Sequence, residues 1–550
     1  MPQKILTPTL IWNNFDDSLP LKENIVNVVP LGKASCNYIY FSGRQTLEGR
    51  VRIYGAYAKQ TGVSKGSMLI LPDVTGGIDK DLFFRFVNEG YDVITVDLGG
   101  ERSGEENYTK YPSDVYYANY EKSGDFFNYA KESAINTSWY EWVAVARYAV
   151  SFLNEKCPNK PIFAMGLKHG ANVLWQLLAT DKRISAGIFV YGAGFLAYNG
   201  IDKHSDVDIE MNDERIRFIA GVEAQSYAQF VTCPTLYFGS TYNCEFNAER
   251  AIDTLSYVDS AKKCHFNISS SAVDVLGGES LTSIDLFLNK YIQKEAVVFP
   301  DQPHIEIDVE NEFLLTELTL FRVQEVESAI LHVSFDGNVI DKRVWHNYEF
   351  NLTGKNKLKC KSKIFANYDS ALCFATVKYK NGLVLSSKFA FKKFENPSKI
   401  KLPNLLYNSQ LYNVEFFVKS VNDDVYSNVI SENVLFDIIE GPSGINGISS
   451  HNTLTTYAIR DLAQNLTSNS FIKLDVYATS YVNLTLVLTA NGVDYTYNVP
   501  VSGGNVWQNL IFELIEFKSE DGQTIEEYTS ITSLTLKSIG VFAVNNIMVL

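Results

Sequence analysis

The sequence predicts a mostly parallel β-sheet with helices on both faces in its first 297 residues, followed by two all-β domains. Two observations carry this prediction. Apolar strands alternate with helical patterns up to about residue 300, which is typical of a parallel sheet with helical crossovers. After Pro300 the helical periodicity disappears, and short alternating strands are separated by hairpin signals such as Asp336-Gly337-Asn338 and Asn381-Gly382.

The elements of the first region follow in a regular order. An antiparallel hairpin over Tyr38 to Ala58, with Gly43 between its two strands, leads into the sheet. The sheet strands expected after it are Ser67 to Pro72, Asp92 to Asp97, Pro161 to Met165, Gly187 to Tyr191 and Thr235 to Phe238. The helices expected between them are Lys80 to Glu89, Trp139 to Asn154 and Ala171 to Thr180.

The all-β part divides into smaller blocks. Strands are expected at Ala329 to Phe335, Leu372 to Tyr379, Leu383 to Phe391, Ile531 to Lys537 and Val541 to Val549. A segment rich in Asn, Pro and Lys, from Glu395 to Asn408, connects the two blocks. The predicted domains are an α/β domain at 1–297, an Ig-like β-sandwich at 298–398, a linker or bridging strands at 399–432, and a β-jelly roll at 433–550.

Composition limits the partners of this chain. Its 550 residues carry a formal net charge of −15, so phosphate-rich partners such as nucleic acid or an anionic membrane are repelled over most of the surface. The first residues lack a basic segment followed by an apolar one, and no later run is apolar enough to span a membrane. The seven cysteines are scattered without a CxxC pair, which disfavours disulfides and a zinc site. We expect a cytoplasmic protein.

The most informative segment is Gly166-Leu167-Lys168-His169-Gly170, which lies between an expected strand and an expected helix. This is the frame of a nucleophile elbow, in which a serine normally stands on a sharp strand-to-helix turn. Lys168 takes the position of that serine. A desolvated lysine can attack carbonyl compounds through a Schiff base, but this chemistry does not suit ester hydrolysis. We therefore interpret Lys168 as a structural or ligand-contacting residue.

The first region resembles the α/β-hydrolase superfamily, in particular its acetyl-xylan-esterase and dienelactone-hydrolase-like branch. Three segments beside the elbow carry the resemblance: Leu69 to Gly77 is similar to the strand and loop on the oxyanion side, Val93 to Gly100 to the next strand and its D-x-x-G turn, and Ile188 to Gly192 to the strand after the elbow helix. The resemblance covers about half the chain. It implies an α/β-hydrolase fold and an ancestry among carbohydrate esterases.

The other triad positions do not match the family. The family's acid follows the strand after the elbow helix in a G-T-x-D context, and here the matching segment, Gly239 to Cys244, places Asn243 or the tyrosine before it at that position. The family's histidine follows the last sheet strand, but the loop after that strand, Ser269 to Asp274, contains none. His265 lies within the strand and is interpreted as a strand residue rather than a displaced base.

Loss of nucleophile, acid and base removes every group that activates an alcohol for acyl transfer. The sequence therefore favours a protein that lacks the family's hydrolytic activity and binds a ligand, such as a glycan, or serves as a scaffold. The alternative is an active acetyl or carbohydrate esterase with a rearranged site. Migrated catalytic groups for that alternative are Ser269, Ser270, His169, Asp274 and Glu245.

Several aromatic and polar residues are candidates for ligand binding. Aromatic rings with polar neighbours hold sugars and other flat ligands, although the same residues equally suit ordinary core packing. The predicted binding residues of the first region are Lys168, His169, Thr75, Gly76, Trp139, Trp142 and Tyr111. We predict solvent-accessible ring faces among Trp139, Trp142 and the tyrosines from Tyr108 to Tyr120.

No cofactor is expected from the sequence. The run Asp202 to Asp208 combines carboxylates with a histidine, which can ligate a metal, but acidic loops of this kind are more often simply solvated. We predict no metal site there.

The block from Asn433 to Leu550 resembles carbohydrate-binding β-jelly-roll modules. The segments Phe471 to Tyr477, Val506 to Leu514 and Ile539 to Ile547 carry this resemblance. It implies that exposed aromatic side chains bind a glycan, and Trp507 is the candidate that we select. The sequence leaves open whether the block binds sugar or is purely structural, and it does not indicate an oligomeric state.

Overall fold

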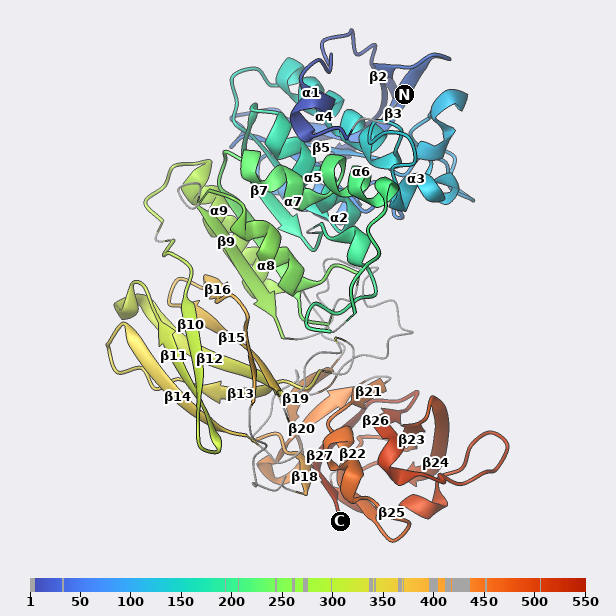
Figure 1. Cartoon of the computed structure of the whole chain (residues 1–550), viewed down its shortest axis with the longest axis vertical. Coiled ribbons are helices and arrows are strands. Elements are labelled where there is room, and N and C mark those ends of the chain that lie inside the picture. The colour runs from blue at the N-terminus through green and yellow to red at the C-terminus, as the bar shows by residue number, and fades with distance from the viewer. Residues whose placement is uncertain are drawn as a thin grey trace. The chain divides into compact units, whose positions relative to one another are not determined.

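The structure is a computed structural model. It describes residues 5–31, 34–192, 194–205, 207–242, 245–259, 263–270, 276–297, 299–335, 340, 343–364, 368, 370–394, 404–410, 417, 436–450, 453–504 and 506–550. The chain divides into two compact units (Figure 1). The first consists of residues 1–268, 278–302 and 381–385, and the second of residues 269–277, 303–380 and 386–550.

The first unit contains a nine-stranded sheet in the order β1-β2-β3-β5-β4-β6-β7-β8-β9. The strands from β1 to β3 are antiparallel, β3 also pairs antiparallel with β5, and the pairs from β5 to β8 are parallel. The bounds are β1 Asn24–Leu31, β2 Ala34–Gln45, β3 Arg50–Gln60, β4 Ser67–Leu71, β5 Asp92–Val96, β6 Ile162–Leu167, β7 Ile184–Val190, β8 Thr235–Ser240 and β9 Cys264–Ser269. This strand order, with a sharp turn after β6, is that of the α/β-hydrolase fold.

Helices follow the parallel strands. Every residue of β4, β5, β6 and β8 is buried, so both faces of the sheet centre are covered, as a parallel sheet requires. The helices are α1 Pro8–Trp12, α2 Lys80–Asn88, α3 Asp125–Asn128, α4 Ser138–Lys156, α5 His169–Thr180, α6 Asp213–Gly221, α7 Ala224–Tyr227, α8 Ala248–Ser256 and α9 Gly278–Tyr291. The expected α/β elements therefore occur in the expected order, with ends that differ by a few residues.

The expected turn at Gly43 is wrong. Gly43 lies inside β2, and the hairpin turns between Gln45 and Arg50 instead. The pairing register shifts between Ser42 and Gln45, and a Cβ atom on Gly43 would lie 3.0 Å from the Ile53 side chain. The glycine therefore marks a bulge with a close cross-strand approach rather than a turn.

The second unit is built from strands. The first two sheets contain β10 His304–Glu310, β11 Phe313–Thr319 and β14 Lys357–Lys363, and β12 Val326–Phe335, β13 His346–Glu349, β15 Ser370–Tyr379, β16 Val384–Ser386 and β17 Ala390–Lys393. Residues 384 and 385 of β16 are counted with the first unit. A six-stranded sheet contains β18 Leu405–Tyr407, β19 Phe436–Glu440, β20 Asn446–Ser450, β22 Phe471–Tyr477, β25 Gln508–Glu513 and β27 Phe542–Val549. A four-stranded sheet contains β21 Thr453–Thr456, β23 Val482–Ala490, β24 Val493–Val501 and β26 Ile531–Lys537.

In the described part of this second unit, the α-helix that occurs is α10, Ile459–Leu462, which is a single turn. The predicted loss of long helices after residue 300 therefore holds for the described residues. The predicted boundaries at 398 and 432 lie outside the described residues, and the division into separate β domains stays a prediction. No helix in the described part of the chain is long and apolar enough to cross a membrane.

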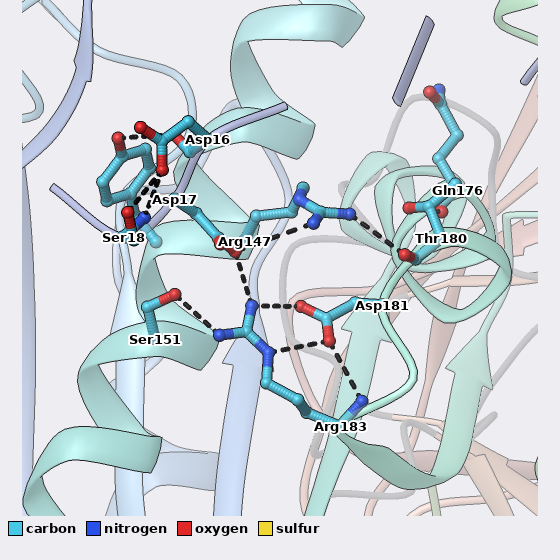
Figure 2. Close-up of polar contacts among 10 residues, drawn as sticks. Asp16, Asp17, Ser18, Arg147, Ser151, Gln176, Thr180, Asp181 and Arg183 are labelled. Atoms are coloured by element: carbon cyan, nitrogen blue, oxygen red, sulfur yellow. Dashed lines mark hydrogen bonds and ion pairs between the residues drawn. The ribbon is translucent and has the colours of Figure 1, made fainter. Parts of the chain in front are cut away.

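Charged side chains connect the N-terminal segment to the middle of α4 and to the residues that end and follow α5 (Figure 2). Arg183 lies between Asp17 and Asp181, with its Nη2 2.5 Å from Asp17 Oδ2 and its Nε donating to Asp181 Oδ1 over 2.8 Å. Arg147 on α4 donates to the carbonyl oxygen of Thr180 over 3.1 Å and lies 3.7 Å from Asp17 Oδ2. These contacts tie residues near the start of the chain to helices that are distant in sequence.

Trp12 anchors the same segment by packing. Its ring is 5% exposed and stacks on Tyr140 of α4 with 4.9 Å between ring centroids, while its Nε1 donates to the Tyr227 hydroxyl over 3.1 Å. The Arg147 guanidinium lies over the same ring. Leu10, two residues earlier in α1, is 64% exposed. The short helix therefore has one buried face and one solvated face.

We expect Trp12→Ala to lower the free energy of unfolding of the first unit by about 3 kcal/mol or more, because it leaves a cavity and removes the hydrogen bond from Trp12 Nε1 to the Tyr227 hydroxyl. Leu10→Ala in the same helix is the matched control and should change it by less than about 0.5 kcal/mol. Denaturant titrations followed by tryptophan fluorescence and by circular dichroism measure both. Equal effects of the two substitutions would contradict the anchoring role of Trp12.

Candidate functional site

The site begins at the turn between β6 and α5, where Lys168 takes up the strained backbone conformation of a nucleophile elbow. Its φ is 52° and its ψ is −115°, which side chains other than glycine rarely adopt. The flanking glycines make the turn possible. A Cβ atom on Gly166 would lie 2.5 Å from the Gly170 carbonyl oxygen, and one on Gly170 would lie 2.2 Å from the Leu71 carbonyl oxygen. The predicted elbow is therefore present, with Lys168 at its apex.

Asp73 reaches the elbow from the adjacent parallel strand. Leu71 at the end of β4 pairs with Gly166 at the end of β6, so the loop after β4 lies beside the turn after β6. The Nδ1 atom of His169 donates a hydrogen bond of 2.6 Å to Asp73 Oδ1. Thr75 donates from its hydroxyl to the other oxygen, Oδ2, over 2.8 Å. Asp73 thus joins the oxyanion-side loop to the first residue of α5.

Glu245 reaches the same histidine from the loop after β8. Its Oε1 lies 3.2 Å from His169 Nε2. This is ion-pair distance, but Nε2 is buried and has no hydrogen bond of normal geometry within the described residues. His169 is therefore held between two carboxylates, one on each side of the ring. Three loops that follow parallel strands β4, β6 and β8 meet at this imidazole.

The two carboxylates determine the charge of His169. Burial by itself would lower the pKa of the imidazole, but the contacts with Asp73 and Glu245 outweigh burial and raise the pKa to about 9. Burial would likewise raise the pKa of Asp73, but His169 and Lys168 hold it below its usual value. His169 is consequently an imidazolium at neutral pH, and Asp73 is a carboxylate. A charged imidazole cannot accept a proton as a general base.

Lys168 completes the group of charges. Its Nζ lies 3.8 Å from Asp73 Oδ2, and its side chain is 15% exposed. Nucleophilic lysines are typically found in desolvated apolar pockets, whereas Lys168 lies in a charged group that contains the Asp73 carboxylate and the His169 imidazolium. Its ammonium is suited to donating hydrogen bonds to a bound molecule. The arrangement therefore supports a contact role for Lys168.

Aromatic rings enclose the buried side of His169. The centroids of Phe246, Phe127, Trp139 and Tyr120 lie 5.1, 5.3, 5.9 and 6.1 Å from the imidazole centroid. This wall excludes water from the ion pair with Asp73, which strengthens it. Tyr120 is only partly buried, and burial followed by the nearby charges of Glu245 and Asp73 raises the pKa of its hydroxyl.

Of the aromatic set predicted to include solvent-accessible faces, Tyr116 is 43% exposed, whereas Trp139 and Trp142 are not accessible. Both indoles are fully buried, and their Nε1 atoms donate to the backbone oxygens of Phe127 and Ala118. The physical reason is that α4 is buried around most of its circumference, so its aromatic residues pack inside the unit. Trp139 therefore contributes to the site as a wall behind His169.

The remaining predicted residues of the first region lie near the same loops. Thr75 and Gly76 are exposed in the loop after β4. Tyr111 is partly buried, and its hydroxyl donates to the Leu98 carbonyl oxygen over 2.6 Å. The ligand contacts predicted for these residues stay predictions. Asn243 and Asp274 lie outside the described residues, as does Asp206 of the acidic loop.

Two further predictions concern histidine and metal. His265 is buried within β9, where its Nε2 lies 2.9 Å from the Tyr291 hydroxyl, and burial lowers its pKa to about 3. It is the strand residue that was expected. Within the ranges that the structure describes, no group of three or more His, Cys, Asp or Glu residues could hold a metal ion.

Glu223 shapes the loop that follows β7. It is fully buried, and its carboxyl oxygens accept hydrogen bonds from the backbone amides of Leu196 and Ala197 over 3.1 and 2.8 Å. Burial raises its pKa to about 7 in spite of these bonds. The same loop contacts the elbow, because a Cβ atom on Gly192 would lie 2.3 Å from the Lys168 carbonyl oxygen.

Trp507 belongs to the second unit. Its ring packs against Gly441 and Gly447, where added Cβ atoms would lie 2.7 and 2.5 Å from the indole, and its centroid is 5.7 Å from that of Tyr477. The ring remains partly exposed. Its binding role stays a prediction.

Sequence reasoning missed Asp73 as a member of the site. The one available signal was its position directly after a buried parallel strand, because such strand ends gather at one edge of the sheet. His169, predicted both as a binding residue and as a migrated catalytic group, and Glu245, predicted only as a migrated catalytic group, are brought together by the fold.

The known proteins to which this chain is similar are remote. No protein-family model matches the chain, and no curated protein matches it. Among solved structures, an acetyl xylan esterase from Thermoanaerobacterium sp. is 14% identical, with a TM-score of 0.34 over 48% of this chain and 84% of that one. A cold-adapted esterase from an Arctic intertidal metagenomic library is 16% identical, with a TM-score of 0.33 over 50% of this chain and all of that one.

A third similar structure is a putative dienelactone hydrolase from Klebsiella pneumoniae. It is 12% identical, with a TM-score of 0.31 over 46% of this chain and 99% of that one. Likenesses at this level carry no argument about activity or ligand. The assignment of the α/β-hydrolase fold rests on the strand order and the elbow.

The raised pKa of His169 predicts how stability depends on pH. The folded pKa of about 9 lies above the unfolded value of 6.5, so the stabilising contribution is complete below pH 6.5 and is lost as the pH rises to about 9. Over this pH range the free energy of unfolding should decrease by up to roughly 3 kcal/mol. We expect this loss in the wild type and not in His169→Gln.

Denaturant titrations of the first unit at pH 6.5 and pH 9.5 measure this difference. Asp73→Asn removes one of the two carboxylates beside His169, so the loss of stability should occur at a lower pH. The same pH dependence in the wild type and in His169→Gln would show that His169 is not the titrating group.

Proposed function

We propose that the first unit is a ligand-recognition domain on an α/β-hydrolase fold that does not hydrolyse esters by the serine mechanism. The observation that carries this proposal is the pair of residues at the elbow. Lys168 holds the backbone conformation of the nucleophile, and the next residue, His169, lies between the carboxylates of Asp73 and Glu245.

The first support is the chemistry of the apex. Acyl transfer on this fold needs a hydroxyl on the strained turn and a neutral histidine within hydrogen-bond distance of it. Lys168 supplies an ammonium beside Asp73, and the histidine at this place is cationic, with burial and its two carboxylates setting a pKa of about 9. Neither group can generate an alkoxide nucleophile.

The second support is the retention of the strained turn. A positive φ at a lysine costs of order 1–3 kcal/mol and persists only where the surroundings determine it. Here the close contacts of Gly166 and Gly170 and the ion pair of His169 determine it. The turn therefore keeps Lys168 at the carboxyl edge of the sheet, where ligands of open α/β folds bind.

The class of ligand follows from the exposed groups of the site. The Lys168 ammonium donates hydrogen bonds, and the exposed Thr75 hydroxyl, whose own hydrogen is donated to Asp73, accepts them, beside the partly exposed ring of Tyr120. This mixture suits a hydroxyl-rich molecule such as a carbohydrate. The partly exposed Trp507 and Tyr477 of the second unit offer a further aromatic surface for the same class of ligand.

We expect the purified protein to hydrolyse p-nitrophenyl acetate and butyrate no faster than Lys168→Ala, because the apex lysine has no part in ester cleavage. Both rates should lie about 10³-fold or more below that of an esterase with an intact triad measured at the same concentration. Lys168→Ser should not restore activity, since the new hydroxyl still lacks a neutral base. Stopped assays over several hours measure all three.

Efficient turnover by the wild type that disappears on replacing one serine would contradict the proposal. That result would favour an esterase with a rearranged site. Ser269 and Ser270 are the first serines to replace, because they lie at the end of β9, where the fold's catalytic histidine loop begins.

A further inference from the structure

The buried edge of His169 lacks a regular hydrogen-bond acceptor. The side chain is 4% exposed, and its Nδ1 is bonded to Asp73. Its Nε2 is also buried, and in the described part of the chain no acceptor makes a hydrogen bond of normal geometry with it. Glu245 Oε1 lies 3.2 Å away, so its carboxylate places a negative charge beside Nε2. It does not lie in the direction of a normal hydrogen bond from the Nε2–H. A buried N–H of this kind stays open to a better acceptor.

The two carboxylates beside His169 are not equivalent. Asp73 is 15% exposed, and both of its oxygens are engaged, one by His169 and the other by Thr75. Glu245 is 49% exposed at the surface end of the site. Its long side chain can rotate into water at little cost, whereas Asp73 cannot leave without breaking two hydrogen bonds. Glu245 is therefore the replaceable counter-ion.

Without Glu245 the charged side chains described around His169 carry a net positive charge. Lys168 and His169 contribute two cations, and Asp73 contributes one anion. The amino end of the twelve-residue helix α5 begins at His169 and adds its partial positive charge. A negatively charged group is thus favoured at the position that Glu245 occupies.

We propose that Lys168 and His169 form a carboxylate-binding site, and that Glu245 is a built-in counter-ion which the carboxylate of a ligand displaces. This inference rests on the proposed recognition function of the first unit and specifies its ligand as an acidic, hydroxyl-rich small molecule. The ligand carboxylate accepts from His169 Nε2 and from the Lys168 ammonium. The exposed hydroxyl of Thr75 and the ring of Tyr120 lie beside this position and contact the remainder of the ligand.

The displacement makes binding a competition between two carboxylates. The ligand carboxylate can contact Lys168 and His169 only after Glu245 has moved away. The ion pair between Glu245 and His169 therefore weakens the affinity of the wild type for the ligand. Removing the charge of Glu245 should therefore strengthen binding. If Glu245 instead held the ligand, the same substitution would weaken binding. The sign of the change in affinity therefore distinguishes the two roles.

The test is isothermal titration calorimetry of the full chain with sodium D-glucuronate as the probe, and with D-glucose and methyl D-glucuronate as neutral comparators. We expect Glu245→Gln to lower the Kd for glucuronate by about tenfold or more relative to the wild type. Lys168→Met should abolish the gain. Glu155→Gln, which removes an exposed carboxylate at the distant end of α4, changes the net charge equally and should leave the Kd unchanged.

A second readout is the imidazole Nε2–H resonance of His169, identified by its loss in His169→Gln. We expect it to shift on addition of glucuronate to Glu245→Gln and not on addition of glucose. This readout separates binding at the elbow from binding elsewhere on the chain.

Three results would overturn the inference: equal affinity for glucuronate and its methyl ester, an unchanged or weaker affinity in Glu245→Gln, or no binding by any variant. None of them bears on the absence of ester hydrolysis, which the assays with p-nitrophenyl esters decide separately. Conversely, ester turnover by the wild type would refute the proposed function even if glucuronate binds.

Discussion

The hydrogen-bonded ion pair between Asp73 and His169 is the interaction on which the arrangement of this site depends. It joins the loop after β4 to the first residue of α5 across two adjacent parallel strands. The pair brings an anion beside Lys168, holds the imidazole in its charged form and presents the opposite nitrogen to Glu245. The aromatic residues around His169 keep water from the pair and so increase its strength. The chemical character of the elbow follows from this one contact.

The fold of a hydrolase and the chemistry of a hydrolase are separable in this chain. The strand order and the strained turn are those of the α/β-hydrolase fold, but the apex residue is a lysine and its neighbour is a cation. The turn is maintained by close backbone contacts of glycines, which do not depend on the identity of the residue at the apex. A scaffold of this kind can lose its nucleophile and still place a charged side chain at the carboxyl edge of the sheet.

Local patterns in the sequence predicted the elements and the elbow, because alternation, helical periodicity and the Gly166/Gly170 frame are all short-range signals. The partnership of Asp73 and His169 was not predictable in this way, since the two residues are 96 positions apart and meet only through the adjacency of β4 and β6. Which aromatic residues of the predicted set are exposed was not predictable for a related reason: Tyr116 is exposed, whereas Trp139 and Trp142 are buried. Aromatic residues beside polar ones suit a binding platform and a buried helix equally, and only the packing of α4 decides between them. Gly43 was misread because a bulge and a turn share the same residue preference.

The charge state of His169 tests this account most directly. Nitrogen-15 NMR of the imidazole, recorded from pH 5 to pH 10, shows whether both ring nitrogens carry a proton and at what pH one is lost. The account predicts a doubly protonated ring at pH 7.5 that titrates near pH 9, and a lower titration midpoint in Asp73→Asn. A neutral ring at pH 7.5 in the wild type would contradict the account, because His169 could then accept a proton and the elbow would regain a base.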